Sequence, residues 1–171
     1  MAGFERVNVG YGTDLHVLKP GDGFMLGGVF IPCPYSCLAD SDGDVLLHAL
    51  VDAMLGSAGL GDIGEHFPKS AITPGESSRR FVEETLEMLG KTGLLIGNVD
   101  CVIDLEKVSL KAWKTSIRES MARMLGMEMQ CVNVKAKTAE GLGPIGEGRA
   151  VAAQVVVLTF AGSSGSPGER L

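Results

Sequence analysis

The clearest pattern in the chain is a stripe of apolar residues that recurs at intervals of three and four between positions 45 and 54, the spacing of an α-helix. Ser41 or Asp42 can cap the start of this helix, and Asp42 and Asp44 place carboxylates near its amino-terminal end. Gly56 and Gly59 mark its end. The sequence therefore predicts one long helix in the first third of the chain.

Two further helices and five strands are predicted around it. One helix opens at Ser77 or Ser78 and ends at Gly90 to Gly93, and another runs from residue 109 to 125 with Gly126 as its terminator. The glycine-containing segment 10–16 is expected to bend, and residues 59–75 are expected to form a loop. Short apolar or alternating runs bounded by turn residues predict strands over residues 7–9, 24–31, 99–105, 131–136 and 150–160.

Strands that alternate with helices, some joined by crossover-length segments, predict a two-layer α/β sandwich with a mixed sheet. The chain has 171 residues, which suits one domain, and we assign that domain to residues 1–160. Residues 162–168 contain only Gly, Ser and Pro and so have no large side chain to bury. We expect a disordered tail over residues 161–171.

Composition and charge narrow the classes of partner. Lys and Arg number 15 against 21 Asp and Glu, and a formal net charge of −6 without a long basic run argues against a nucleic-acid-binding surface. No apolar run approaches the roughly 18 residues needed to cross a bilayer, and the first residues lack the pattern of a secretory signal. We therefore expect a cytoplasmic protein with no membrane partner, whose four cysteines are reduced and bind no metal.

Asp14, His16 and His48 are the strongest candidates for a metal site. Asp14 and His16 are two positions apart, so on an extended backbone their side chains leave the same face. His48 lies on the long helix between Asp44 and Asp52, at i−4 and i+4. One Asp and two His with an open fourth position suit a catalytic zinc. The alternative is that His48 is a core residue and Asp14 a turn residue, while Asp44 or Asp52 orients His48 or caps the helix.

Two loops carry further candidate chemistry. Residues 59–64, GLGDIG, place three glycines around Asp62, so backbone amides could approach a ligand whose hydroxyls the carboxylate binds. Residues 135–143, KAKTAEGLG, follow a strand and combine ammonium groups, a hydroxyl and a carboxylate that could hold phosphate oxygens and Mg2+. A helix-ending loop and a solvated strand end are the respective alternatives. His66 is expected in a surface loop, and no Ser-His-Asp or Cys-His arrangement is indicated.

Taken together, these segments closely resemble the 2-C-methyl-D-erythritol 2,4-cyclodiphosphate synthases, the cyclising enzymes of the non-mevalonate isoprenoid pathway. The resemblance covers about residues 5–160. Six motifs carry it in order: GYGTDLH (10–16), GGVFIP (27–32), SDGDVLLH (41–48), GDIGEHFP (61–68), GNVD (97–100) and VNVKAKT (132–138). Their order and spacing are hard to obtain by chance.

The resemblance implies that Asp14, His16 and His48 ligate one Zn2+ per subunit. It implies that Thr138 and Glu140 meet the substrate diphosphate and a second metal, Mg2+ or Mn2+, and that active sites lie between the subunits of a homotrimer. The substrate would be 4-diphosphocytidyl-2-C-methyl-D-erythritol 2-phosphate, whose 2-phosphate attacks the β-phosphate within the same molecule. The products would be the 2,4-cyclodiphosphate and CMP, which makes the enzyme a phosphorus-oxygen lyase.

The same resemblance assigns the remaining site positions. Asp40 and Thr138 fall at catalytic positions, although the family usually has His where this chain has Asp40. The chain also has Val108 and Ser109 where the family usually has Pro-Lys, and Lys69 begins a segment that is usually acidic. The positions that match substrate-binding residues are Ser41, Asp62, Ile63, Gly64, Phe67, Leu105, Glu106, Lys107, Val108, Ser109, Lys137 and Arg149.

Two other functions stay open at this point. Asp40 and the missing Pro-Lys are compatible with a catalytically impaired paralogue, a metal-bound trimer that binds a nucleotide or an isoprenoid phosphate. A generic zinc phosphohydrolase is the third possibility. Incubation with the cytidine diphosphate substrate separates the three, because only the synthase releases CMP by cyclisation, whereas the hydrolase releases inorganic phosphate.

Overall fold

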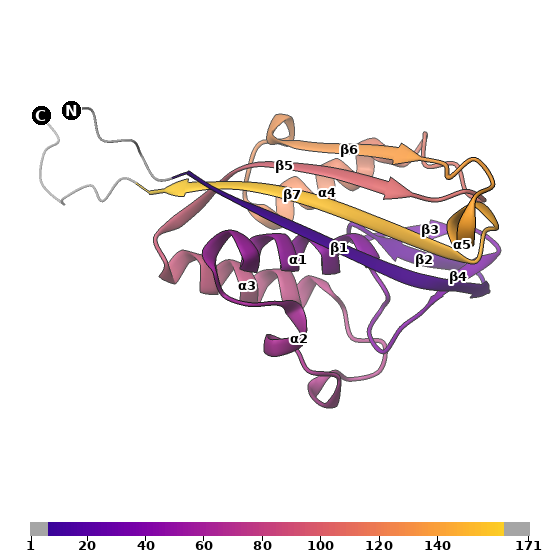
Figure 1. The fold of residues 1–171 in the computed structure, drawn as a ribbon, viewed down its shortest axis with the longest axis horizontal. Coiled ribbons are helices and arrows are strands. Elements are labelled where there is room, and N and C mark those ends of the chain that lie inside the picture. The colour runs from indigo at the N-terminus through magenta and orange to yellow at the C-terminus, as the bar shows by residue number, and fades with distance from the viewer. Residues whose placement is uncertain (1–6, 163–171) are drawn as a thin grey trace, which may run out of the picture.

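A mixed five-stranded sheet forms the frame of the molecule (Figure 1). The computed structural model describes residues 7–162. β5 and β6 run parallel and the other neighbours antiparallel, so the predicted α/β sandwich with a mixed sheet is confirmed. In their order across the sheet, the strands are β4 (Tyr35–Leu38), β1 (Val7–Pro20), β7 (Ala150–Ala161), β5 (Leu94–Asp104) and β6 (Val132–Lys137).

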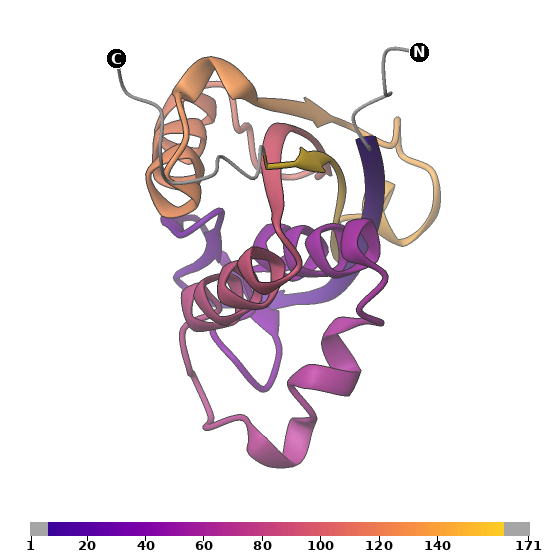
Figure 2. The same cartoon turned by 90° about the vertical axis from the view of Figure 1, so that its left-hand side faces the viewer.

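Three long helices pack on one side of this sheet, as Figure 2 shows; they are α1 (Val45–Ala58), α3 (Arg79–Lys91) and α4 (Lys114–Leu125). All three were predicted, but α4 begins at Lys114 rather than at residue 109, since the residues just before it form a turn. Asp44 caps α1 by accepting a hydrogen bond from Leu47 N at 3.1 Å, so the prediction of Ser41 or Asp42 as the cap was wrong. Gly59 and Gly126 end α1 and α4 in the left-handed conformation.

The segment predicted to bend at residues 10–16 is instead the middle of β1, a continuous strand of 14 residues. Its pairing with β7 runs unbroken from Val7 opposite Phe160 to Val17 opposite Ala150. The glycines serve another purpose: a Cβ at Gly10 would lie 1.7 Å from Ala53 O, and one at Gly12 would lie 2.1 Å from Ala49 O. Gly10 and Gly12 therefore let α1 lie directly against the strand.

The single strand predicted over residues 24–31 is a hairpin of β2 (Gly23–Leu26) and β3 (Val29–Pro32). Gly27 and Gly28, with φ of 60° and 74°, form its two-residue turn, which requires positive φ at both positions. β5 begins at Leu94 rather than at residue 99, passing through an irregularity between Ile96 and Asn98. The predicted loop 59–75 contains the short helices α2 (Ile63–His66) and η1 (Lys69–Ala71), and the remaining short elements are η2 (Met129–Cys131) and α5 (Gly143–Gly146).

The core between sheet and helices is mostly aliphatic, with Phe24, Phe67 and Phe81 as its aromatic members, and α1 is buried along most of its length. The opposite face of β1 leaves Val9, Tyr11 and Leu15 more than half exposed. All four cysteines are free thiols, as predicted. β7 includes Ala161, and the rest of the predicted tail beyond Gly162 lies outside the described residues. In the part of the chain that the structure describes, no helix has the length and apolar character to cross a membrane.

Candidate metal centre and substrate pocket

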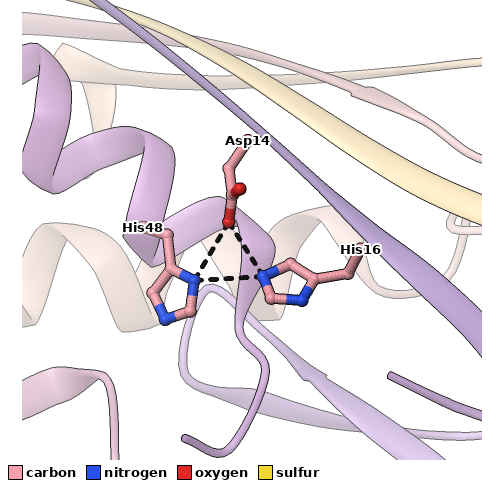
Figure 3. Close-up of side chains that lie close together, drawn as sticks. All are labelled: Asp14, His16 and His48. Atoms are coloured by element: carbon pink, nitrogen blue, oxygen red, sulfur yellow. Dashed lines mark hydrogen bonds and ion pairs between the residues drawn. The ribbon is translucent and has the colours of Figure 1, made fainter. Parts of the chain in front are cut away.

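Asp14, His16 and His48 converge on one point between β1 and α1, as Figure 3 shows. Asp14 Oδ2 lies 2.8 Å from His16 Nε2 and 3.0 Å from His48 Nδ1, and the two ring nitrogens are 3.1 Å apart. The alternation of β1 directs Asp14 and His16 to the helix side, and the close approach at Gly12 brings His48 within reach. One carboxylate oxygen and two imidazole nitrogens thus meet at one point, which we call the metal focus.

Hydrogen bonds around the two rings fix which nitrogen faces that focus. Ser78 Oγ donates to Asp42 Oδ1 at 2.5 Å, so it can only accept from His48 Nε2, 2.9 Å away. The proton of His48 therefore lies on Nε2, which leaves the Nδ1 lone pair directed at the focus. Nδ1 of His16 lies 3.4 Å from Leu38 O, which places a proton there and frees Nε2 in the same way.

Electrostatics at the focus favour a cation. Burial raises the pKa of Asp14, but its close contacts with the His16 and His48 rings outweigh this effect and hold that pKa far below its usual value. Burial lowers the pKa of His16, but the adjacent Asp14 carboxylate outweighs this effect and raises that pKa above its usual value. The Asp14 carboxylate is therefore ionised, and the negative charge that raises the pKa of His16 would also attract a metal cation to this point.

Asp44 and Asp52 do not orient the His48 ring. Their carboxylates instead accept hydrogen bonds from backbone amides. Asp44 is fully buried and accepts from Gly27 N at 2.8 Å and Gly28 N at 2.6 Å in addition to its capping bond. Asp52 accepts from Ile63 N at 2.7 Å and so connects α1 to α2. The alternative of a helix cap therefore holds for Asp44 but not for Asp52. The Nε2 atom of His48 is instead contacted by Ser78 and by Ser41, whose Oγ lies 3.2 Å away.

An open pocket of about 400 Å³ lies over the focus. Several residues predicted from the resemblance line it: Asp40, Ser41, Ile63, Gly64 and Phe67. Asp62, which precedes Ile63 in the sequence, caps the start of α2 by accepting a hydrogen bond from Glu65 N at 3.1 Å. His66, expected in a surface loop, belongs to α2 and is half-buried, with Nε2 2.7 Å from Leu60 O.

A second group of predicted residues gathers where β5 and β6 end, and none of its members lines this pocket. Thr138 Oγ1 donates to Glu140, whose φ of 51° is unusual outside glycine. Glu106 Oε2 accepts from Ala139 N at 3.0 Å, which joins the two strand ends. Members at this edge also include Leu105, which is buried, Val108, which is half-buried, and the exposed Lys107, Ser109, Lys137 and Arg149.

Ser78, Asp42 and Lys69 are the functional candidates that the sequence reasoning passed over. Ser78 was interpreted as a helix start and Asp42 as a helix cap, and 36 positions separate the two residues that hydrogen-bond to one another. Lys69 also lines the pocket, and its Nζ lies 3.4 Å from Asp40 Oδ2. Sequence periodicity does not predict contacts between loops that are far apart in the chain. The only available signal is the residue type, since Ser, Asp and Lys are common in functional sites.

An α/β sandwich that brings a carboxylate and two imidazoles together beneath an open pocket could hold a divalent metal ion, as the active sites of metalloenzymes do. The chain belongs to the YgbB family, whose family model matches residues 7–160. It is 48% identical over 156 residues to the 2-C-methyl-D-erythritol 2,4-cyclodiphosphate synthase of Xylella fastidiosa (strain 9a5c), which covers 91% of this chain and 89% of that protein.

Solved structures show the same fold. The chain superimposes on IspF of Plasmodium falciparum in its CDP complex with a TM-score of 0.83 and 30% identity, covering 94% of this chain and 100% of that one. The bifunctional IspDF of Campylobacter jejuni gives a TM-score of 0.88 and 32% identity over 92% of this chain but only 43% of that chain. The family resemblance predicted from the motifs is therefore confirmed.

Proposed function

We propose that the chain converts 4-diphosphocytidyl-2-C-methyl-D-erythritol 2-phosphate into 2-C-methyl-D-erythritol 2,4-cyclodiphosphate with release of CMP, as a phosphorus-oxygen lyase. The convergence of Asp14, His16 and His48 beneath an open pocket is the observation that carries this proposal. A match over 91% of this chain to a relative of that name supports it. The CDP bound to the Plasmodium falciparum structure supports a cytidine nucleotide as part of the ligand.

The three converging residues fit a zinc ion. Tetrahedral zinc with bonds of about 2.0–2.1 Å sets its ligand atoms about 3.3 Å apart, and the three atoms here are separated by 2.8 to 3.1 Å. Both rings present a free lone pair, and the carboxylate is ionised. When bound, the ion would supply positive charge to a phosphate oxygen through its open position.

The protein residues around the pocket would orient the substrate. The attacking phosphate and the attacked phosphate belong to one molecule, so holding them in line provides much of the rate enhancement without a covalent intermediate. Ile63 and Gly64 line the pocket wall where hydroxyls of the methylerythritol would bind, and Ser41 lies beside His48. Phe67 closes the side toward the core.

We also propose that the active enzyme is a homotrimer whose pocket is completed by a neighbouring subunit. The residues at the ends of β5 and β6 would then bind the nucleotide of the next subunit's substrate, with Thr138 on the diphosphate and Glu140 on Mg2+ or Mn2+. Support comes from their position, since they gather away from the pocket of their own chain. The apolar outer face of β1, which includes Val9 and Tyr11, would be covered in such an assembly.

CMP release from the purified protein with substrate, zinc and Mg2+ tests the activity. We expect CMP and the cyclic diphosphate in equal amounts. Inorganic phosphate in place of the cyclic product would indicate a hydrolase, and a zinc-loaded protein that binds CDP without releasing CMP from substrate would indicate a binding protein.

His48→Ala tests the metal site directly. The variant should lose zinc and activity while keeping its fold and its oligomeric state, because the apolar face of α1 is unchanged. His66→Ala is the matched control, since His66 lies outside the pocket lining and bonds to Leu60 O. Full zinc content in His48→Ala would exclude His48 as a ligand.

A further inference from the structure

Lys69 is the single Lys or Arg among the described residues that line the pocket. The same lining includes the carboxylates of Asp14, Asp40 and Asp52. Asp14 belongs to the metal focus and Asp52 accepts from the backbone, which leaves Asp40 as an acid at the pocket edge. A phosphate ester entering here meets this negative charge before it reaches the metal site. Its binding therefore calls for a cation away from the focus.

Asp40 and Lys69, which form an ion pair, both belong to segments that are held in place by contacts with other parts of the fold. Phe67 is 5% exposed and packs against Phe81 with ring centroids 4.8 Å apart, so it fixes the chain just before Lys69. On the other side, Asp40 O accepts from Gly75 N at 3.0 Å, which ties the two loops together. The segment that carries Lys69 is thus tied to the core and to the loop of Asp40, while the Lys69 side chain, 89% exposed, reaches the pocket edge beside Asp40.

We propose that Lys69 binds a phosphate oxygen of the substrate at the pocket edge, and that Asp40 is the positioning residue that holds its ammonium there. This inference rests on the proposed function, which puts a phosphate ester in the pocket. The Nζ to Oδ2 distance of 3.4 Å is longer than a strong charge-assisted hydrogen bond, so Lys69 retains N–H donors for a ligand. The ion pair also explains how a carboxylate at position 40 is compatible with a pocket that binds anions, because the Lys69 ammonium lies beside that carboxylate and offsets its charge.

Steady-state CMP release separates this role from a structural one. Lys69→Ala should raise KM about tenfold, which corresponds to about 1.4 kcal/mol, with kcat within about twofold, because the contact would exist before and during the reaction. Lys69→Arg should keep KM within about threefold of wild type. Lys91→Ala, which removes the same charge from the exposed end of α3, is the matched control and should leave both constants unchanged.

Calorimetric titration of the zinc-loaded protein with 2-C-methyl-D-erythritol 2,4-cyclodiphosphate supplies a readout independent of turnover. We expect Lys69→Ala to bind about tenfold more weakly than wild type and than Lys91→Ala. Equal affinities, or no binding by wild type, would overturn the role of Lys69. Normal binding that depends on Lys69 without any CMP release would overturn the proposed function and leave this inference standing.

A double-mutant cycle tests the part of Asp40. If Asp40 positions the ammonium, Lys69→Ala should weaken binding less in an Asp40→Asn background than in wild type, because the lysine there is no longer held over the pocket. An equal effect in both backgrounds would show that the residues act independently. A larger effect in the Asp40→Asn background would show that Asp40 competes with phosphate for the lysine, which also contradicts a positioning role.

Discussion

Replacing Asp44 by Ala should destabilise the protein more than any single loss of a helix cap. The carboxylate of Asp44 is fully buried and accepts three backbone hydrogen bonds, from Gly27, Gly28 and Leu47. It therefore joins the turn of the β2–β3 hairpin to the first turn of α1. Alanine would leave these three amide groups without their acceptor at the place where two elements meet.

The size of the effect follows from the exposure of each amide. Loss of an N-cap bond, here to Leu47, costs about 1 kcal/mol. A buried donor left unsatisfied costs roughly 1–3 kcal/mol, which applies in full to Gly27 because that residue is buried. Gly28 is half-buried, so water can replace part of its bond and its cost falls near the lower limit. The free energy of unfolding should fall by about 3–5 kcal/mol.

Urea denaturation followed by circular dichroism measures this loss, with the slope m compared to establish that the unfolded state is unchanged. Asp62→Ala is the matched control, because Asp62 caps the short, exposed helix α2 through a single bond to Glu65 N. That variant should lose at most about 1 kcal/mol. A loss below about 1 kcal/mol for Asp44→Ala would mean that the buried amides find other acceptors, and the reasoning would be refuted.

Three further results are expected. Gly12→Ala should destabilise the fold by at least about 1–3 kcal/mol, since its Cβ would lie 2.1 Å from Ala49 O; Gly56→Ala, on an exposed turn of α1 with nothing within 4 Å, should instead stabilise it by about 0.5–1 kcal/mol in the same denaturation assay. Burial raises the pKa of the Cys101 thiol to about 12, so at pH 8 iodoacetamide should modify Cys101 far more slowly in the native protein than in urea, and equal rates would contradict this. Ser78→Ala should weaken zinc binding about tenfold, because the N–H group at Nε2 of His48 would lose its hydrogen-bond acceptor and the ring its fixed orientation. Unchanged affinity in a competitive chelator titration would show that other contacts orient the ring.

Periodicity identified the three long helices and β7 because each of them buries one continuous face. The apolar stripe of α1 and the nearly all-apolar run of β7 are visible without any knowledge of the partners they pack against. The Asp14–His16 spacing placed half of the metal focus in the same way, because an extended backbone fixes the direction of side chains two positions apart. The helical position of His48 supplied the remaining candidate, but not its distance from the other two.

Glycine misled the sequence interpretation where its role depended on a distant partner. Gly10 and Gly12 have the composition of a bend, yet they lie within a straight ladder with β7, and it is α1 that requires a position without Cβ. Gly27 and Gly28, in contrast, are a true turn inside what looked like one strand. The same residue type therefore had opposite meanings, and only the contact with α1 distinguishes them.

The two groups of site residues differ in what a single chain can determine. The metal focus is complete within one chain, because β1 and α1 pack against each other through Gly12 and the rings are oriented by the hydrogen bonds that they donate to Ser78 Oγ and Leu38 O. The residues at the ends of β5 and β6 are also fixed, yet they lie outside the pocket that contains this focus. Loss of zinc and loss of nucleotide binding should therefore be separable by mutation, with His48→Ala affecting zinc and Glu106→Ala, which releases Ala139 N, affecting CDP affinity alone. If Glu106→Ala removed zinc as well, the two groups could not be independent halves of one site.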